Sequence, residues 1–429
     1  MTQTANSFTK KLNIVISKFS RNVIIRTISA GMARILPVTI IASFVMVFQS
    51  LPFKGYQSFI ETTGIDNLLS LGATMTNGLI SLYIVICLSS EMAKIYKKET
   101  LNAILISLIS FLILTPLTIF DVEGSAIQAF TLTNFGSKGI FVAMIVSIVA
   151  TGSYVFLIDK GVRVKMPKDV PPAITHGFDS ILIAVIISAG FLIINWLIGL
   201  TDYSDIHNLI YSILQKPLEG MGSSLWTMIV ICMIGEGFWW FGIHGSNVTS
   251  AVVKTIYLPL ALANSEAVMS GNTPEFILNS FFMDVYKGPR HLALACMLLF
   301  LARSKHLRSI GKVAIIPGIF GISEPMKFGI PMIFNPILLV PMTFAPVISI
   351  IIAYFATVIG FISPVTIAVP VMPAFVSGVF ANGLHGAIVQ IIQFVVIILL
   401  YLPFFKYLDK QKVKEESIIG EDVNDASSI

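Results

Sequence analysis

The chain has 429 residues, of which 55% are hydrophobic and only 12% are charged, with a formal net charge of +5. This composition excludes an ordinary soluble domain, in which about a quarter of the residues are charged, and it predicts an all-α polytopic membrane protein. The positive charge does not indicate a nucleic-acid partner, because Lys and Arg in membrane proteins first follow the orientation of the loops.

The amino-terminal segment 1–27 is predicted to be a basic amphipathic helix on the membrane surface. It carries five Lys or Arg residues and no acid, and Phe8, Leu12 and Phe19 recur at helical spacing. Such a helix lies in the lipid interface with its apolar face toward the acyl chains. No cleavable signal peptide is expected, because the first long apolar run begins near Ile28 and is long enough to span the bilayer.

Apolar runs of the length that a spanning helix needs, about 20 residues, follow this segment. They lie at about 28–48, 68–90, 101–120, 139–158, 181–200, 337–362 and 386–405. Shorter pieces interrupted by Gly, Pro and charge lie at 235–264, 311–336 and 363–386. Two of these pieces are expected to be re-entrant hairpins, because broken backbone at membrane depth is tolerated where it lines a cavity. In total the sequence predicts about ten spanning helices.

Loop charge predicts that both chain termini face the cytoplasm, because Lys and Arg concentrate in cytoplasmic loops. The segments 1–27, 91–100 and 159–177 together carry twelve Lys or Arg residues. The segments that alternate with them, 49–67, 121–138 and 201–222, carry three. The loop 303–312 and the tail after residue 405 are also basic and are placed inside. The polar stretch 415–425 is expected to be disordered.

Two bundles are predicted, with their boundary in the outer segment 201–222, which carries three acidic residues and is long enough for an interfacial helix. The expected organisation is a surface helix at 1–27, an amino-terminal bundle at 28–222, a carboxy-terminal bundle at 223–405 and a cytoplasmic tail at 406–429.

Residues 235–247 combine an aromatic block with an imidazole. The stretch reads G-E-G-F-W-W-F-G-I-H-G-S-N and contains Trp239, Trp240, His244 and Asn247. Aromatic rings beside hydrogen-bonding groups are what a sugar requires, since its C–H face packs on a ring while its hydroxyls take directed partners. The alternative is an aromatic belt at the membrane interface with a structural histidine. Composition alone leaves both interpretations open.

The segment 317–336 cannot be one continuous spanning helix. It reads P-G-I-F-G-I-S-E-P-M-K-F-G-I-P-M-I-F-N-P, and seven of its twenty residues are Gly or Pro. Proline removes helical hydrogen bonds, and Pro325 biases Glu324 toward extended backbone. A carboxylate at membrane depth is costly and by default marks a functional pathway, so Glu324 is predicted to contact the solute.

Other interpretations of these polar residues remain open. Glu324 also fits a structural ion pair with Lys327, and Lys327 itself fits either a ligand contact or a side chain that reaches the interface. Asn247 and Asn335 fit either hydroxyl recognition or the capping of broken backbone.

Recognisable catalytic and metal motifs are absent from the sequence. It contains no P-loop, no G-x-S-x-G, no H-E-x-x-H and no Cys/His cluster, and its three cysteines lie far apart. These spacings predict no metal site and no cofactor. Glu236 and Lys254, two further charges in apolar surroundings, are expected to pair with each other or with backbone.

The stretches F-W-W-F-G-I-H-G (238–245) and G-I-S-E-P-M-K-F-G-I-P-M-I-F-N-P (321–336) resemble a known family. They look like the membrane permease, enzyme IIC, of the bacterial phosphoenolpyruvate-dependent sugar phosphotransferase system, in the lactose/cellobiose/diacetylchitobiose branch. The resemblance covers nearly the whole chain. It implies a bacterial cell-membrane protein whose amino-terminal bundle forms a homodimer and whose carboxy-terminal bundle encloses a sugar with two re-entrant hairpins.

The resemblance also implies a mechanism. A β-linked disaccharide such as cellobiose, diacetylchitobiose or lactose would be imported and phosphorylated, with Glu324 and His244 beside the hydroxyl that receives the phosphoryl group. The donor is a phosphocysteine on enzyme IIB, which is expected to be a separate protein, so that phosphoryl transfer occurs only with that partner. Many relatives have a tryptophan near a W-T-x-P pattern, where this chain has Val371 and Met372.

A different class of function fits some of the same residues. A proton-coupled secondary sugar carrier would use Glu324 and His244 as a titrating pair, and broken helices at a midplane site suit carriers as well. The two classes differ in their product, because a carrier delivers free sugar whereas the phosphotransferase permease delivers sugar phosphate.

Overall fold

The computed structural model describes residues 22–49, 54–122, 125–162, 180–241, 244–330, 332 and 335–426. The chain divides into two compact units, of which the first comprises Met1–Met221 and Lys254–Pro274 and the second comprises Gly222–Val253 and Glu275–Ile429. Most of the predicted surface helix, up to residue 21, lies outside the described residues.

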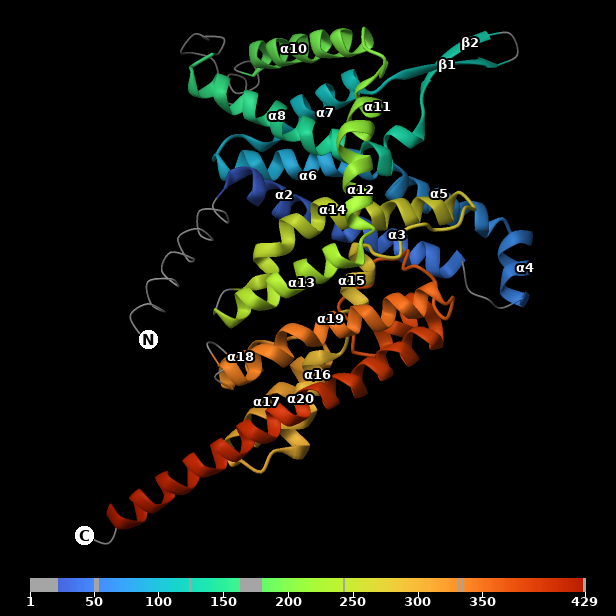
Figure 1. The fold of residues 1–429 in the computed structure, drawn as a ribbon. Coiled ribbons are helices and arrows are strands. Elements are labelled where there is room, and N and C mark those ends of the chain that lie inside the picture. The colour runs from blue at the N-terminus through green and yellow to red at the C-terminus, as the bar shows by residue number, and fades with distance from the viewer. Residues whose placement is uncertain are drawn as a thin grey trace. The chain divides into compact units, whose positions relative to one another are not determined.

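The first unit is built from helices that follow one another closely along the chain (Figure 1). They are α2 (Val23–Arg34), α3 (Leu36–Gln49), α4 (Lys54–Thr62), α5 (Ile65–Thr76), α6 (Ile80–Ile95), α7 (Thr100–Leu114), α8 (Ile140–Asp159), α10 (Ile181–Gly199), α11 (Ile206–Ile210) and α12 (Lys216–Gly222) up to Met221. The later part of α14 (Gly245–Met269), from Lys254 on, also belongs to this unit. Helix α6 contacts α2, α7 and α8.

Small and hydroxylated side chains line the contacts of α6, α7 and α8. Ser107 on α7 and Thr151 on α8 are both buried, and their hydroxyls lie 3.2 Å apart. A side chain at Gly31 would overlap Leu88 of α6. Such residues allow helices to approach closely in a membrane. Close packing matters there because apolar side chains contact lipid tails about as favourably as they contact another helix.

The apolar run 101–120 is not one spanning helix, which corrects the prediction. Helix α7 ends at Leu114, and β1 (Leu117–Val122) pairs with β2 (Ser125–Phe130) as an antiparallel ribbon that projects from the helices of its unit (Figure 1). Thr115 has extended backbone (φ −82°, ψ 120°), because the following Pro116 disfavours the helical region. The ribbon is an exception to the predicted all-α fold.

The second unit contains broken helices around one apolar core. Its elements are α13 (Leu225–Trp240), the beginning of α14 (Gly245–Met269), α15 (Ser280–Tyr286), α16 (Arg290–Cys296), a π-helical turn (Met297–Leu301), α17 (Lys305–Ile319), α18 (Glu324–Gly329), α19 (Pro336–Val358) and α20 (Val376–Ala426). Its core includes Trp239, Leu298, Met326 and Tyr401, all of them buried.

Two pairs of glycines allow tight helical turns in the second unit. A Cβ atom at Gly245 would overlap the carbonyl oxygen of Gly235, so α13 and α14 meet backbone to backbone. Gly378 and Gly386 make the same kind of contact on either side of a kink in α20. Within that kink Gly383 has φ +61° and ψ −154°, a conformation that is accessible essentially to glycine alone.

The tail prediction was wrong, because α20 continues to Ala426 instead of becoming disordered at 415–425. Asp409 accepts hydrogen bonds from the amides of Arg303 and Ser304. Glu416 accepts from the Ser304 hydroxyl and from the amides of the next two residues. Acidic side chains stabilise a helix amino terminus by accepting from its free N–H groups, and here they bind the tail to the start of α17.

The protein is a polytopic membrane protein that is mostly helical. Within the described ranges, six helices are long and apolar enough to cross a membrane, namely Val23–Gln49, Ile65–Ile95, Ser137–Asp159, Ile181–Gly199, Pro336–Val358 and Val376–Ile418. A seventh is added if the segments Ile206–Gly222 and Leu225–Trp240, bent by 77°, form one span.

Candidate functional site

The turn between α13 and α14 brings Trp239 against His244. Their ring centroids lie 4.3 Å apart with the planes inclined by 49°. Trp239 is buried whereas His244 is exposed, so the imidazole forms the accessible side of the pair. The close contact of Gly235 with Gly245 makes this short turn possible.

Helix α18 places a cation on the face of the same indole. It begins at Glu324, with Pro325 in its first turn, where the missing N–H is tolerated. The ammonium group of Lys327 lies 3.7 Å from the centroid of the Trp239 ring, which is cation–π geometry. Three of the predicted site residues, Trp239, His244 and Lys327, are therefore brought together.

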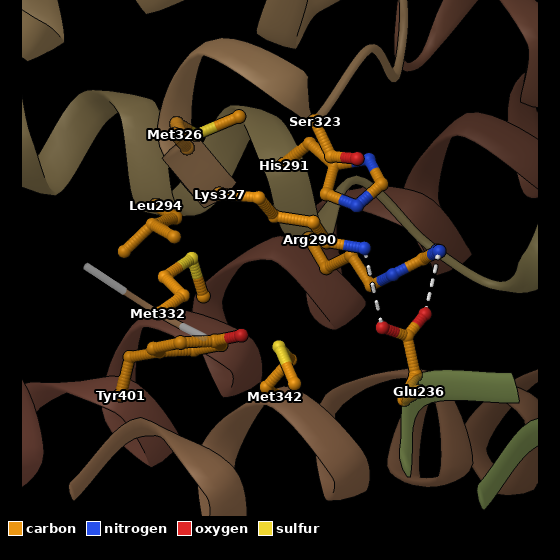
Figure 2. Close-up of a pocket in the computed structure, with 10 residues that line it drawn as sticks. All are labelled: Glu236, Arg290, His291, Leu294, Ser323, Met326, Lys327, Met332, Met342 and Tyr401. Carbon is orange, nitrogen blue, oxygen red and sulfur yellow. Dashed lines mark hydrogen bonds and ion pairs between the residues drawn. The ribbon is translucent and has the colours of Figure 1, made fainter. Parts of the chain in front are cut away.

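The carboxylate of Glu236 joins two cations in the second unit (Figure 2). Its Oε1 lies 3.2 Å from Nη2 of Arg290, and its Oε2 lies 3.5 Å from Nζ of Lys327. Glu236 is thus an acidic partner of Lys327, while the possible pair of Lys327 with Glu324 involves a side chain outside the described part of the structure. Lys254 donates to the carbonyl oxygen of Ser29, which is a backbone partner of the kind that the sequence left open for it. We call Glu236, Arg290 and Lys327 the buried ion cluster.

A small cavity borders the buried ion cluster. Besides the cluster it is lined by His291, Leu294, Ser323, Met326, Met332, Met342 and Tyr401. Figure 2 shows the charged groups on one side of the space and the methionines and Tyr401 on the other. The cavity holds about 10 Å³, which is room for a single water.

Trp240 and Asn335 meet at the start of α19. The indole N–H of Trp240 donates to the backbone carbonyl of Asn335 over 2.9 Å, and the Asn335 side chain accepts from the amide of Ile337 over 3.0 Å. The side chain of Asn335 therefore caps α19, which is one of the two roles that the sequence left open. The side chains of Glu324 and Asn247 lie outside the described part of the structure.

Sequence reasoning missed Arg290, His291 and Tyr401. The signal for the first two is the stretch K-G-P-R-H at 287–291, where a Gly-Pro break precedes two polar residues in an apolar region. His291 donates from Nδ1 to the carbonyl oxygen of Gly321 over 2.7 Å, which links α16 to the loop before α18. Nothing local in the sequence identifies Tyr401 as a cavity residue.

Comparison with known proteins identifies the family. Residues 29–346 match the family described as "Phosphotransferase system, EIIC". The chain belongs to this EIIC family. It is 34% identical over 417 residues to the PTS system cellobiose-specific EIIC component of Geobacillus stearothermophilus, covering 91% of each chain. It is 30% identical over 390 residues to the oligo-beta-mannoside-specific EIIC component of Bacillus subtilis (strain 168), covering 89% of this chain and 88% of that one.

A solved structure extends the likeness to three dimensions. The transporter ChbC, the IIC component from the N,N'-diacetylchitobiose-specific phosphotransferase system, superposes with a TM-score of 0.89 at 32% identity, covering 95% of this EIIC and 98% of that chain. The predicted family resemblance is thereby confirmed. Membership implies a sugar substrate and an EIIB partner for this EIIC.

Proposed function

We propose that this EIIC imports a β-linked disaccharide and releases it inside the cell as the sugar phosphate, with phosphorylated EIIB as donor. The proposed substrate class is supported by the similarity of this chain to cellobiose-specific and N,N'-diacetylchitobiose-specific components. Lactose is the third candidate, since a lactose-specific EIICB component of Staphylococcus haemolyticus is 26% identical over 421 residues.

The sugar is proposed to bind around the α13–α14 turn in the second unit. Trp239 and Trp240 provide aromatic surface for its C–H faces, and His244 provides an accessible polar group beside them. Asn247, Lys327 and Asn335 are proposed to contribute hydrogen bonds to hydroxyls. The contacts of Trp239 with both His244 and Lys327 support one shared site.

Glu324 and His244 are proposed to act at the reacting hydroxyl. The phosphorus–sulfur bond of the phosphocysteine on EIIB breaks, the sugar oxygen forms a bond to phosphorus, and the thiolate leaves with the electron pair. Glu324 accepts the proton of the hydroxyl, and His244 hydrogen-bonds the same oxygen. Catalysis of this kind gains mainly from positioning the reactants, which suits a residue held at the first turn of α18.

The proposed architecture is a pair of bundles, 28–222 and 223–405, with about ten spanning helices. The two compact units support the bundles, and the glycine contacts Gly235–Gly245 and Gly378–Gly386 support two re-entrant hairpins in the second. Only 17% of the apolar window of α10 is buried, so its outer face suits lipid or a second copy in a homodimer. Membership of the EIIC family supports a bacterial cell membrane location, and loop charge supports an orientation with both termini in the cytoplasm.

Vectorial phosphorylation by purified protein tests the proposal. Liposomes containing this EIIC, with EIIB and a phosphoryl supply inside, are expected to convert external cellobiose into internal cellobiose phosphate. Omission of EIIB is expected to abolish the product. Accumulation of free sugar that stops when the proton gradient is collapsed would instead support a proton-coupled carrier.

A further inference from the structure

The start of α17 carries cations at the end of a helix where positive charge is unfavourable. Lys305 and Arg308 lie in its first turn, and that turn contains no acidic residue. The free N–H groups of a helix amino terminus favour negative charge, so Lys and Arg there destabilise the helix. No Asp or Glu occurs anywhere in Lys305–Ile319. Compensation for these cations therefore has to come from another element.

The tail of α20 supplies that compensation. Its carboxylates Asp409 and Glu416 accept hydrogen bonds of 2.8 to 3.1 Å from the four consecutive amides of residues 303–306. The hydroxyl of Ser304 also donates to Glu416, over 2.6 Å. Asp409 is buried and Glu416 is half-buried. The acids thus lie between the two helices, where they bind backbone and leave the outer faces to the cations.

Both helices present rows of cations outside this contact. On α17, Lys305, Arg308 and Lys312 have the i, i+3, i+7 spacing of one helical face, and on α20 Lys406 and Lys410 are four residues apart. All five side chains are exposed. The two rows are neighbours, because one begins beside Ser304 and the other flanks Asp409. We call these five residues the basic surface.

The position of the basic surface favours a soluble partner over lipid. Glu416 lies eleven residues after Phe405, where the last apolar run ends, which is about 16 Å along the helix axis. The headgroup layer is only about 5 to 8 Å thick on each side of the bilayer. Since Glu416 binds the amide of Lys305, the start of α17 lies beyond that layer. The exposed apolar residues Val313 and Ile316, which suit lipid, come later in α17.

We infer that the basic surface is the place where phosphorylated EIIB docks. The inference rests on the proposed function and adds to it the surface that binds the partner. Loop charge places this surface in the cytoplasm, where EIIB acts, and the surface belongs to the same unit as the proposed sugar site. A phosphoryl group adds a charge of about −1.5 to −2 to the partner. Complementary charge accelerates the encounter of two proteins and orients them.

A variant that neutralises the α17 row tests the inference. Lys305→Gln, Arg308→Gln and Lys312→Gln, combined in one chain, should raise the KM for EIIB by about tenfold or more at low salt. High salt should reduce this difference because exposed charges are screened. The maximal rate at saturating EIIB and the affinity for cellobiose should stay unchanged. The measurement is cellobiose phosphate formed by the full chain in lipid nanodiscs as EIIB is titrated.

The first unit provides a control with the same change of charge. Lys94, Lys97 and Lys160 are exposed cations that loop charge also places in the cytoplasm. Their combined substitution by Gln should leave the KM for EIIB unchanged. Size-exclusion chromatography and cellobiose affinity would show that both triple variants are folded. Equal increases of the KM in the two variants would assign the effect to net charge and overturn the inference.

Lipid composition separates EIIB from the membrane as the partner of the basic surface. The increase of the KM in the α17 variant should be the same in nanodiscs with and without anionic lipid. An increase that requires anionic lipid would assign the surface to headgroups, and an unchanged KM would leave it no role in docking; either result overturns the inference.

Direct binding of EIIB without sugar separates this inference from the proposed function. If the unmodified protein forms no cellobiose phosphate, the proposed function is wrong for this sugar. Weaker binding of EIIB to the α17 variant than to the control variant would still support the docking surface. If the unmodified protein forms the product and both variants bind EIIB equally, the proposed function stands and the docking surface is wrong.

Discussion

Two regions of this EIIC contain the same set of charges, two cations on one carboxylate, in different surroundings. Around Glu91 in the first unit, the side chains of Arg34 and Lys94 are 55% and 48% exposed. Around Glu236 in the second unit, those of Arg290 and Lys327 are 13% and 6% exposed. The two carboxylates are similarly buried, at 12% exposed for Glu91 and 8% for Glu236. The two clusters therefore differ in the burial of their cations, not in residue composition.

The largest expected effect is on activity and falls on the second unit. Glu324→Gln keeps the shape of the side chain but removes the proton acceptor, so vectorial phosphorylation should fall by about 100-fold or more. Glu91→Gln should retain activity. The measurement is cellobiose phosphate formed inside liposomes. If the Glu324 variant phosphorylates the sugar at the rate of the unmodified protein, Glu324 is not the proton acceptor.

The next largest expected difference between the two clusters is in the free energy of unfolding of their variants. Glu236→Gln removes the carboxylate that pairs with the buried Arg290 and Lys327 and should cost about 3 kcal/mol, whereas Glu91→Gln, whose two cations are half exposed, should cost about 1 kcal/mol. Thermal unfolding in detergent checks both values, and equal losses would show that burial does not separate the two clusters.

A pH effect is expected from the first unit. His207, which lies outside the six candidate spans, is buried with its ring beside Phe111, and desolvation lowers its pKa from 6.5 to about 4. Nearby Asp205 raises this pKa and Lys138 lowers it. The folded state therefore keeps His207 neutral while the unfolded state takes up a proton below about pH 6.5.

Stability should thus be full above about pH 6.5 and should decline as the pH falls toward 4, by about 2 kcal/mol at pH 5. Thermal unfolding between pH 7.5 and 5 measures the decline. His207→Gln should unfold with a weaker pH dependence. A pH dependence that is unchanged in this variant would assign the effect to other groups.

The smallest expected effect concerns the absent aromatic ring. Val371 is 80% exposed, so a larger side chain there meets little steric resistance. Val371→Trp should change cellobiose affinity by about tenfold or less, the range of a single aromatic contact. Val371→Leu is the control for size. If tryptophan and leucine have the same effect, no stacking surface is missing at this position.

Local chemistry explains which features could be predicted from the sequence. The break at 317–336 and the Trp239–His244 turn were predictable because Gly, Pro and aromatic residues act within a few positions of the chain. All six candidate spans of the described ranges were recognisable from the length of their apolar runs. Pro116 was also a local signal for the end of α7, although the sequence analysis predicted that a helix continues past this proline.

Other features depend on contacts between distant segments. Glu236 and Arg290 are 54 positions apart, and which helices face each other is not encoded by local periodicity. The tail was predicted to be disordered from its polarity, yet Glu416 binds the start of α17 more than 100 positions away. The ribbon β1–β2 was missed because an apolar strand resembles the end of an apolar helix.

The central claim is that this EIIC imports a β-linked disaccharide and releases it as the sugar phosphate, with phosphorylated EIIB as donor. Vectorial phosphorylation by the purified protein in liposomes tests it most directly. The account predicts that external cellobiose appears inside as cellobiose phosphate and that omission of EIIB abolishes this product. Free cellobiose that accumulates inside and stops accumulating when the proton gradient is collapsed would contradict it.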